Sequence, residues 1–191
     1  MRGIPFHVLV ADIPWRFRDK MPSYGAKKLG RGASAHYSTM SVEEACLFPI
    51  PRMADDSILL LWRVAAMQEE ALKVCRAWGF VPKSEIVWRK LTRKGGLHFG
   101  QGHYTRGAHE TCLIATRGSG PSVVKLRNIR STFDAPVGRH SEKPGSFFDL
   151  VERWLVGPYA ELFARRRRPG WATFGLEVDG PVRGRLTRMA A

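Results

Sequence analysis

HVLVADIPW, residues 7–15, is the segment of the sequence most informative about the fold. Its first part, His7 to Ala11, is an apolar, β-rich run that predicts a buried strand, and Asp12 follows it directly. In α/β sheets, ligands bind beyond the carboxyl ends of the strands. The stretch therefore predicts a functional site at Asp12, although Asp and Pro are also common in turns that simply end a strand.

Outward from this stretch, strands and helices alternate, which predicts an α/β fold with a mostly parallel sheet. Further strands are expected at residues 57–62, 84–89, 110–116, 159–164 and 171–175. Helices are expected after Ser41, which forms a capping box with Glu44, and at residues 65–78 and 144–155. We expect an antiparallel excursion near residues 84–116. Irregular segments are expected at residues 16–36, 90–109 and 120–143.

Length and composition suit one globular domain, because the chain has 191 residues and 44% of them are hydrophobic. We expect this domain to span residues 1–178 and the Gly-, Arg- and Pro-rich residues 179–191 to form a loose basic tail. Lys and Arg number 31 against 17 Asp and Glu, and the net charge of +14 indicates a polyanionic partner. Charge alone is also compatible with a merely basic soluble protein.

The expected compartment is the cytoplasm of a bacterial or phage-infected cell. No apolar run approaches the roughly 20 residues that span a bilayer, so no membrane association is expected. No secretory signal pattern occurs at the start of the chain. The three cysteines are far apart and form no CxxC pair, which is typical of reduced, mostly buried thiols.

The tetrapeptide Asp12, Ile13, Pro14 and Trp15 contains the groups that methylation of an adenine amine requires. The lone pair of that amine is delocalised into the ring, so an enzyme must hold the amine in line and desolvated before an activated methyl donor. A carboxylate and a backbone carbonyl can each accept one amine hydrogen, and an aromatic ring can stack on the base. Asp12, a backbone carbonyl near Pro14 and the Trp15 ring supply these parts.

Several short motifs follow the tetrapeptide in a fixed order. They are YSTMS from Tyr37, EIVW from Glu85 with Lys90, GHY from Gly102 with His109-Glu110, Arg130-Ser131, HSEKP from His140 and ELFAR from Glu161. Together with the tetrapeptide, which is similar to the Asp-Pro-Pro-aromatic signature of amino-group methyltransferases, they resemble one family of adenine N(6)-methyltransferases. That family includes the catalytic subunit writing N(6)-methyladenosine in eukaryotic messenger RNA, and many bacterial and phage members. The resemblance runs from about His7 to Val178.

The resemblance implies a Rossmann-like fold that uses S-adenosylmethionine (SAM) as the methyl donor. It also implies a permuted order, in which the catalytic motif precedes the SAM-associated strand. The resemblance implies that the whole tetrapeptide is catalytic. The cofactor-binding residues implied are Asp12, Lys143, Arg165, Arg167 and Glu177. The predicted substrate-binding residues are Tyr37, Lys90, His103, Tyr104, Arg106, Glu110 and Arg130. The arginine run stands at a strand end next to the expected cofactor, which favours Arg165 and Arg167 inward. Arg166 and Arg168 are expected to lie outward or on phosphate. No metal is expected, because the histidines lack carboxylate partners at ligand spacing.

Three positions depart from the family pattern. Ile13 replaces the first of two prolines, Arg167 stands where the messenger-RNA enzyme has a histidine, and Leu176 stands where relatives commonly have a ribose-bonding asparagine. The resemblance implies methylation of adenine in nucleic acid, with DNA favoured over RNA. A requirement for the 2′-hydroxyl would distinguish the two. A catalytically inactive nucleic-acid-binding relative is the remaining alternative, and the sequence leaves the oligomeric state open.

Overall fold

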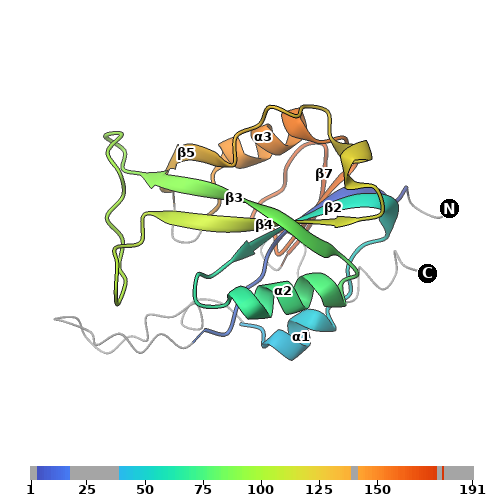
Figure 1. The fold of residues 1–191 in the computed structure, drawn as a ribbon, viewed down its shortest axis with the longest axis horizontal. Coiled ribbons are helices and arrows are strands. Elements are labelled where there is room, and N and C mark those ends of the chain that lie inside the picture. The colour runs from blue at the N-terminus through green and yellow to red at the C-terminus, as the bar shows by residue number, and fades with distance from the viewer. Residues whose placement is uncertain (1–3, 18–38, 139–141, 176–177, 179–191) are drawn as a thin grey trace.

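A seven-stranded sheet in the order β5-β3-β4-β2-β1-β6-β7 forms the centre of the protein (Figure 1). The computed structural model describes residues 4–17, 39–138, 142–175 and 178. Its strands are β1 (Phe6–Asp12), β2 (Met53–Arg63), β3 (Val81–Leu91), β4 (His109–Arg117), β5 (Thr132–Pro136), β6 (Tyr159–Leu162) and β7 (Trp171–Phe174). Its helices are α1 (Val42–Cys46), α2 (Gln68–Ala77), α3 (Gly145–Trp154) and the short 3-10 helix η2 (Gly120–Val123).

The sheet is mixed, and β4 is the one described strand that runs against the others. It pairs antiparallel with β2 and β3, whereas β1 pairs parallel with β2 and β6, β6 with β7, and β3 with β5. The predicted α/β class, mostly parallel with an antiparallel excursion near residues 84–116, is confirmed. As a consequence, the carboxyl ends of the parallel strands and the start of β4 share one edge of the sheet.

The two faces of the sheet bury separate hydrophobic clusters. Along β1, Leu9 and Ala11 face the cluster that includes α1 and α2, whereas Val8 and Val10 face the cluster that includes α3. Figure 1 shows α1 and α2 on one side of the sheet and α3 on the other. All four of these side chains are at most 1% exposed, as expected for a central strand covered on both faces. The carboxyl end of β1 is therefore held by a rigid core.

Local sequence signals explain most element boundaries. The capping box of α1 is present: the Ser41 hydroxyl accepts from the Glu44 N–H at 3.2 Å, and the Glu44 carboxylate accepts from the Ser41 N–H at 2.8 Å. The expectation of irregular structure at 120–143 is wrong for η2 and β5. β5 is a five-residue strand at the edge of the sheet with a single buried residue, so it lacks a strong periodic pattern. The basic tail at 179–191 lies outside the described residues.

Candidate active site

Four charged side chains from distant parts of the chain meet at the carboxyl edge of the sheet. The Lys143 Nζ lies 2.7 Å from Asp12 Oδ2 and 3.2 Å from Glu110 Oε2. The Lys90 Nζ lies 2.6 Å from the other Glu110 oxygen, Oε1. The Lys143 side chain is 9% exposed, and the other three are 21–26% exposed. We call these four residues the charged cluster; each was predicted from the sequence as catalytic, cofactor-binding or substrate-binding.

Sheet register brings the charged cluster together. Asp12 ends β1 and lies level with Trp62 of β2, which pairs with Cys112 of β4. Glu110 precedes Cys112 by two residues and therefore points to the same face of the sheet. Lys90 comes from the end of β3, and Lys143 from just before α3. The cluster thus depends on pairing between strands that are far apart in the sequence.

Electrostatics keep Lys143 and Glu110 charged near neutral pH. Burial by itself would lower the pKa of Lys143, but the carboxylates of Asp12 and Glu110 outweigh burial and raise that pKa. Burial by itself would raise the pKa of Glu110, but the ammonium groups of Lys143 and Lys90 outweigh it and lower that pKa. The Lys143 Nζ also lies 5.2 Å from the centroid of the Trp62 ring, a cation–π contact.

The tetrapeptide after β1 forms a tightly bonded turn. The Trp15 N–H donates to the Ile13 carbonyl at 2.8 Å, and the Met40 N–H donates to the Pro14 carbonyl at 2.8 Å. The Trp15 indole N–H donates to the Trp62 carbonyl at 3.5 Å, and Trp15 is 4% exposed. Each carbonyl oxygen keeps a second lone pair, so these internal bonds leave it able to accept a substrate hydrogen. Stacking of Trp15 on the base stays a prediction.

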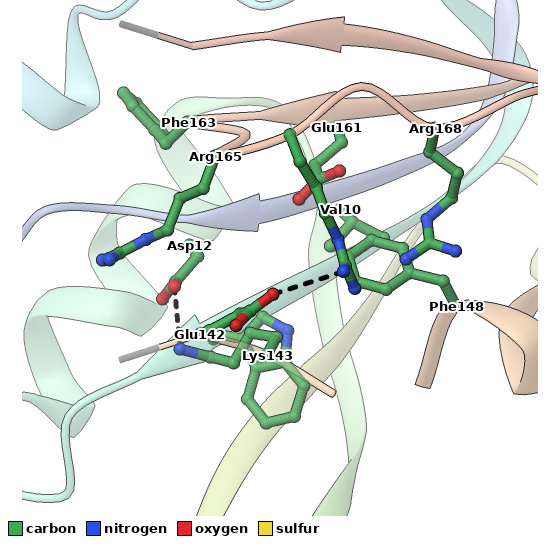
Figure 2. A pocket seen from close by; sticks show the side chains of 11 residues that line it. Val10, Asp12, Glu142, Lys143, Phe148, Glu161, Phe163, Arg165 and Arg168 are labelled. Atoms are coloured by element: carbon green, nitrogen blue, oxygen red, sulfur yellow. Dashed lines mark hydrogen bonds and ion pairs between the residues drawn. The ribbon is translucent and has the colours of Figure 1, made fainter. Parts of the chain in front are cut away.

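A pocket opens beside the charged cluster (Figure 2). Its empty volume is about 430 Å³, counting the part that is open to solvent. It is lined by Val10, Asp12, Trp62, Glu142, Lys143, Phe148, Glu161, Phe163, Arg165, Arg166 and Arg168. Figure 2 shows the contact between Asp12 and Lys143, with Glu161, Arg165 and Arg168 coming from β6 and the segment that follows it. Acidic and basic groups around apolar side chains suit a ligand that carries both charges.

The backbone that follows β6 takes an unusual conformation where it reaches the pocket. Phe163 has a φ of 62°, in the left-handed region that bulky residues rarely adopt. The next residue, Ala164, donates its N–H to the Phe174 carbonyl at 2.9 Å. A Cβ on Gly175 would overlap the Ala164 carbonyl, so glycine is required there. The strained turn therefore ends strand alternation before the arginine run begins.

This turn explains why the predicted orientations of the four arginines are partly wrong. Arg165 lines the pocket as expected, but Arg166 and Arg168 line it too, although they were expected to lie outward or on phosphate. Arg167 is not among the lining residues, and its guanidinium donates to the Val178 carbonyl at 3.3 Å. Because β6 ends at Leu162, the arginine run does not continue the strand. Binding of the cofactor by Arg167 stays a prediction.

Glu161 is a pocket residue that sequence reasoning did not select. Its pKa is raised to about 7, because burial and the nearby Asp12 carboxylate together outweigh the opposing effect of Arg168 and other nearby cations. The sequence contained a signal for this residue, because Glu161 stands between the apolar residues Ala160 and Leu162 near the carboxyl end of a strand. In the structure both of these neighbours are fully buried. Burying an ionised carboxylate in that position destabilises the fold unless the carboxylate faces a polar site or a ligand.

Other predicted site residues lie away from this pocket or outside the described residues. His103, Tyr104 and Arg106 lie in the exposed loop between β3 and β4, and none of them lines the pocket. Arg130 precedes β5 and borders a separate groove near Trp154. Tyr37, Glu177 and the position of the departure at Leu176 lie outside the described residues. The roles predicted for these residues remain predictions.

The part of the chain that the structure describes contains neither a metal-binding cluster nor a membrane-spanning helix. No group of three or more His, Cys, Asp or Glu side chains there could hold a metal ion. No helix in the same residues is long and apolar enough to cross a membrane. Cys75 and Cys112 are buried, Cys46 is partly buried, and all three are free thiols.

A mixed α/β sheet with a charged pocket at the carboxyl ends of its strands is consistent with a methyltransferase-like protein. Residues 6–177 match the MT-A70 family model, and the chain belongs to this family of adenine N(6)-methyltransferases. The family and enzyme class inferred from the ordered motifs are therefore confirmed. Members of the family use SAM as the methyl donor.

Named relatives resemble nearly the whole chain. "Type II methyltransferase M.MunI" of a Mycoplasma species is 29% identical over 187 residues, which cover 91% of this chain and 78% of that protein. The human and mouse proteins named "N(6)-adenine-specific methyltransferase METTL4" are each 26% identical. Those alignments cover 91% and 92% of this chain but 37% and 38% of the METTL4 proteins, so this chain matches little more than a third of their length.

Proposed function

We propose that this protein transfers the methyl group of SAM to the exocyclic amine of adenine in DNA. The observation that carries the proposal is the contact between Asp12 and Lys143 on the wall of the pocket. It places the carboxylate of the tetrapeptide beside a cation that can hold a cofactor carboxylate. The permuted motif order implied by the family resemblance belongs to the same proposal.

The pocket residues fit SAM, which carries a carboxylate, an ammonium and a sulfonium. Lys143 and Arg165 can bind the carboxylate, and Glu161 can face the cationic groups. Two buried donors on lining residues, Trp62 Nε1 and Arg168 Nε, have no hydrogen-bond partner among the described residues. Buried donors without partners are rare, and a bound polar ligand would satisfy them.

In this scheme SAM supplies the activated methyl group, and the protein positions the acceptor. The Asp12 carboxylate accepts a hydrogen bond from the adenine amine, which becomes cationic as it attacks. Lys143 holds Asp12 in place and is itself held by Glu110, which a second ion pair joins to Lys90. The backbone carbonyl of Pro14 can accept the second amine hydrogen.

DNA is the favoured polymer for two reasons. The net charge of +14 suits a polyanion of either kind. The similarity to a type II methyltransferase, which covers 91% of the chain, supports DNA in particular. In a duplex the target adenine must leave the base stack, at a cost of a few kcal/mol that a single strand avoids.

The first prediction concerns the substrate. Tritiated SAM is incubated with adenine-unmethylated genomic DNA, with its heat-denatured strands and with RNA transcribed from it, and the labelled nucleosides are then separated. Label is expected in N(6)-methyldeoxyadenosine, with at least tenfold less label in RNA. Label confined to RNA would replace DNA by RNA in the proposal. SAM binding without any transfer would favour the inactive relative.

The second prediction concerns pH and Glu161. SAM is a net cation and favours the ionised carboxylate, so its affinity should rise by up to about tenfold per pH unit as pH increases towards 7, and then level off. The ammonium of SAM titrates near the usual α-amino pKa of about 7.7–8.0, above the pH range in which Glu161 is expected to ionise. Calorimetry on the wild type and on Glu161→Gln isolates the contribution of Glu161. Equal pH slopes in the two proteins would place Glu161 away from the cofactor.

A further inference from the structure

The loop between β3 and β4, residues 92–108, combines cations with exposed aromatic side chains. It contains Arg93, Lys94 and Arg106 and no Asp or Glu. Phe99 is 76% exposed and Tyr104 is fully exposed, and they are the two large exposed aromatic residues among those the structure describes. Aromatic side chains are normally buried, so two of them displayed on one acid-free loop indicate a binding surface.

The loop is folded, so the exposure of these rings is a feature of its structure. The His98 N–H donates to the Lys90 carbonyl at 2.8 Å, and the Gly100 N–H donates to the Gly107 carbonyl at 3.0 Å. A Cβ on Gly100 would overlap the Gly107 carbonyl, so glycine permits this close approach of the two loop segments. Backbone bonds thus close the loop while its aromatic rings remain outside.

The loop projects beyond the edge of the sheet where the active site lies. Ile86 of β3 is level with Asp12 through the pairings with Cys112 and Trp62. β3 continues for five more residues to Leu91, which is about 17 Å of extended chain. Figure 1 shows β3 and β4 continuing as a hairpin past the helices. This length matches about five nucleotides of a stacked strand, so the loop can reach nucleotides that flank a target base at Asp12.

The chemistry of the loop fits unpaired nucleotides better than a protein surface. The Arg106 guanidinium lies 5.2 Å from the centroid of the Phe99 ring. This contact places a group that can bind phosphate beside a ring that can stack on a base. Aromatic rings stack on bases of any sequence, and cations beside them bind the backbone. Because paired bases in a duplex stack on one another, their faces are closed to these rings.

We propose that the β3–β4 loop is an accessory binding site for unpaired nucleotides beside the target adenine. Phe99 and Tyr104 stack on bases, while Arg93, Lys94 and Arg106 bind the intervening phosphates. The proposal rests on the proposed function in that its ligand is the nucleic-acid substrate. It adds that the preferred substrate is single-stranded or locally opened next to the target.

The third prediction tests this site with a probe that contains no adenine. Fluorescence anisotropy measures binding to a thymine-only strand of about 15 nucleotides and to an abasic strand of equal length. The wild type should bind the thymine strand more tightly. The double replacement Phe99→Ala/Tyr104→Ala should weaken binding to the thymine strand by at least about fivefold per ring and leave binding to the abasic strand unchanged.

Matched controls separate stacking from general damage. Leu97→Ala removes an exposed, non-aromatic side chain from the same loop and should change neither affinity. Arg93→Ala/Lys94→Ala should weaken binding to both strands equally and reduce the salt dependence. Unchanged SAM affinity and circular dichroism establish that the double variant folds.

Each other result has a defined meaning. Wild-type affinity of the double variant for the thymine strand would overturn the accessory site, and so would equal losses on both strands. Conversion of a dimer to a monomer by the double variant, measured by light scattering, would show a self-association surface instead. Failure of the wild type to bind any nucleic acid at low salt would refute the proposed function itself.

Discussion

Replacement of Asp12 by Ala is expected to reduce the single-turnover rate of adenine methylation by at least about 10²–10³-fold, the usual cost of removing one group that stabilises developing charge. The amine nitrogen becomes cationic as it attacks, so the Asp12 carboxylate binds the transition state more strongly than the ground state. The fold should survive, because Lys143 keeps its ion pair with Glu110 at 3.2 Å. The rate is measured with saturating SAM and substrate, so that binding defects do not contribute.

Two companion variants sharpen this prediction. Asp12→Asn should be less damaging than Asp12→Ala, because an amide oxygen still accepts a hydrogen bond but carries no charge. Asp134→Ala removes a surface carboxylate that pairs with Arg89 at 2.6 Å and should leave the rate unchanged. Near-normal turnover by Asp12→Ala would remove the tetrapeptide from the active site, and with it the main support for the proposed chemistry.

The parts of the fold that could be predicted from sequence are those with a strong local pattern. The apolar run before Asp12 gave β1, and the capping box at Ser41 gave the start of α1. β5 was missed because an edge strand with one buried residue has neither a continuous apolar run nor a regular alternation. The position of β5 is determined by its pairing with β3, which lies more than 40 residues earlier in the sequence. A local sequence pattern contains no information about such a pairing.

For the site as well, the sequence could identify individual residues but could not predict which of them are in contact. Family resemblance selected Asp12, Lys90, Glu110 and Lys143, but their mutual contacts follow only from the sheet register. The expected split of the arginine run failed for Arg166 and Arg168, which line the pocket, because Phe163 adopts a left-handed conformation just after β6. The next residue, Ala164, donates its N–H to the carbonyl of Phe174 in β7, a contact that no local pattern in the sequence indicates.

Replacement of Lys143 by Met should affect both stability and cofactor binding. Removal of one partner from a buried ion pair costs about 3–5 kcal/mol, and the lower part of that range applies because Asp12 and Glu110 are each about a quarter exposed. SAM affinity should fall by about 1.5–3 kcal/mol if Lys143 binds the cofactor carboxylate. Urea unfolding and calorimetry measure the two effects separately.

The pH dependence of the stability loss identifies its cause. In the wild type, the lowered pKa of Glu110 contributes stability that is present above the usual glutamate pKa and is lost as pH falls through the folded-state pKa. In Lys143→Met the two carboxylates repel each other, so the stability deficit should be largest at neutral pH and shrink in acid. Adding Glu110→Gln removes one of the two charges and should restore part of the stability at pH 7 without restoring SAM affinity. A deficit that is independent of pH, or an absence of rescue by Glu110→Gln, would mean that the charged cluster contributes little to stability. Lys143 would then stabilise the fold through burial of its side chain and its contact with the Trp62 ring.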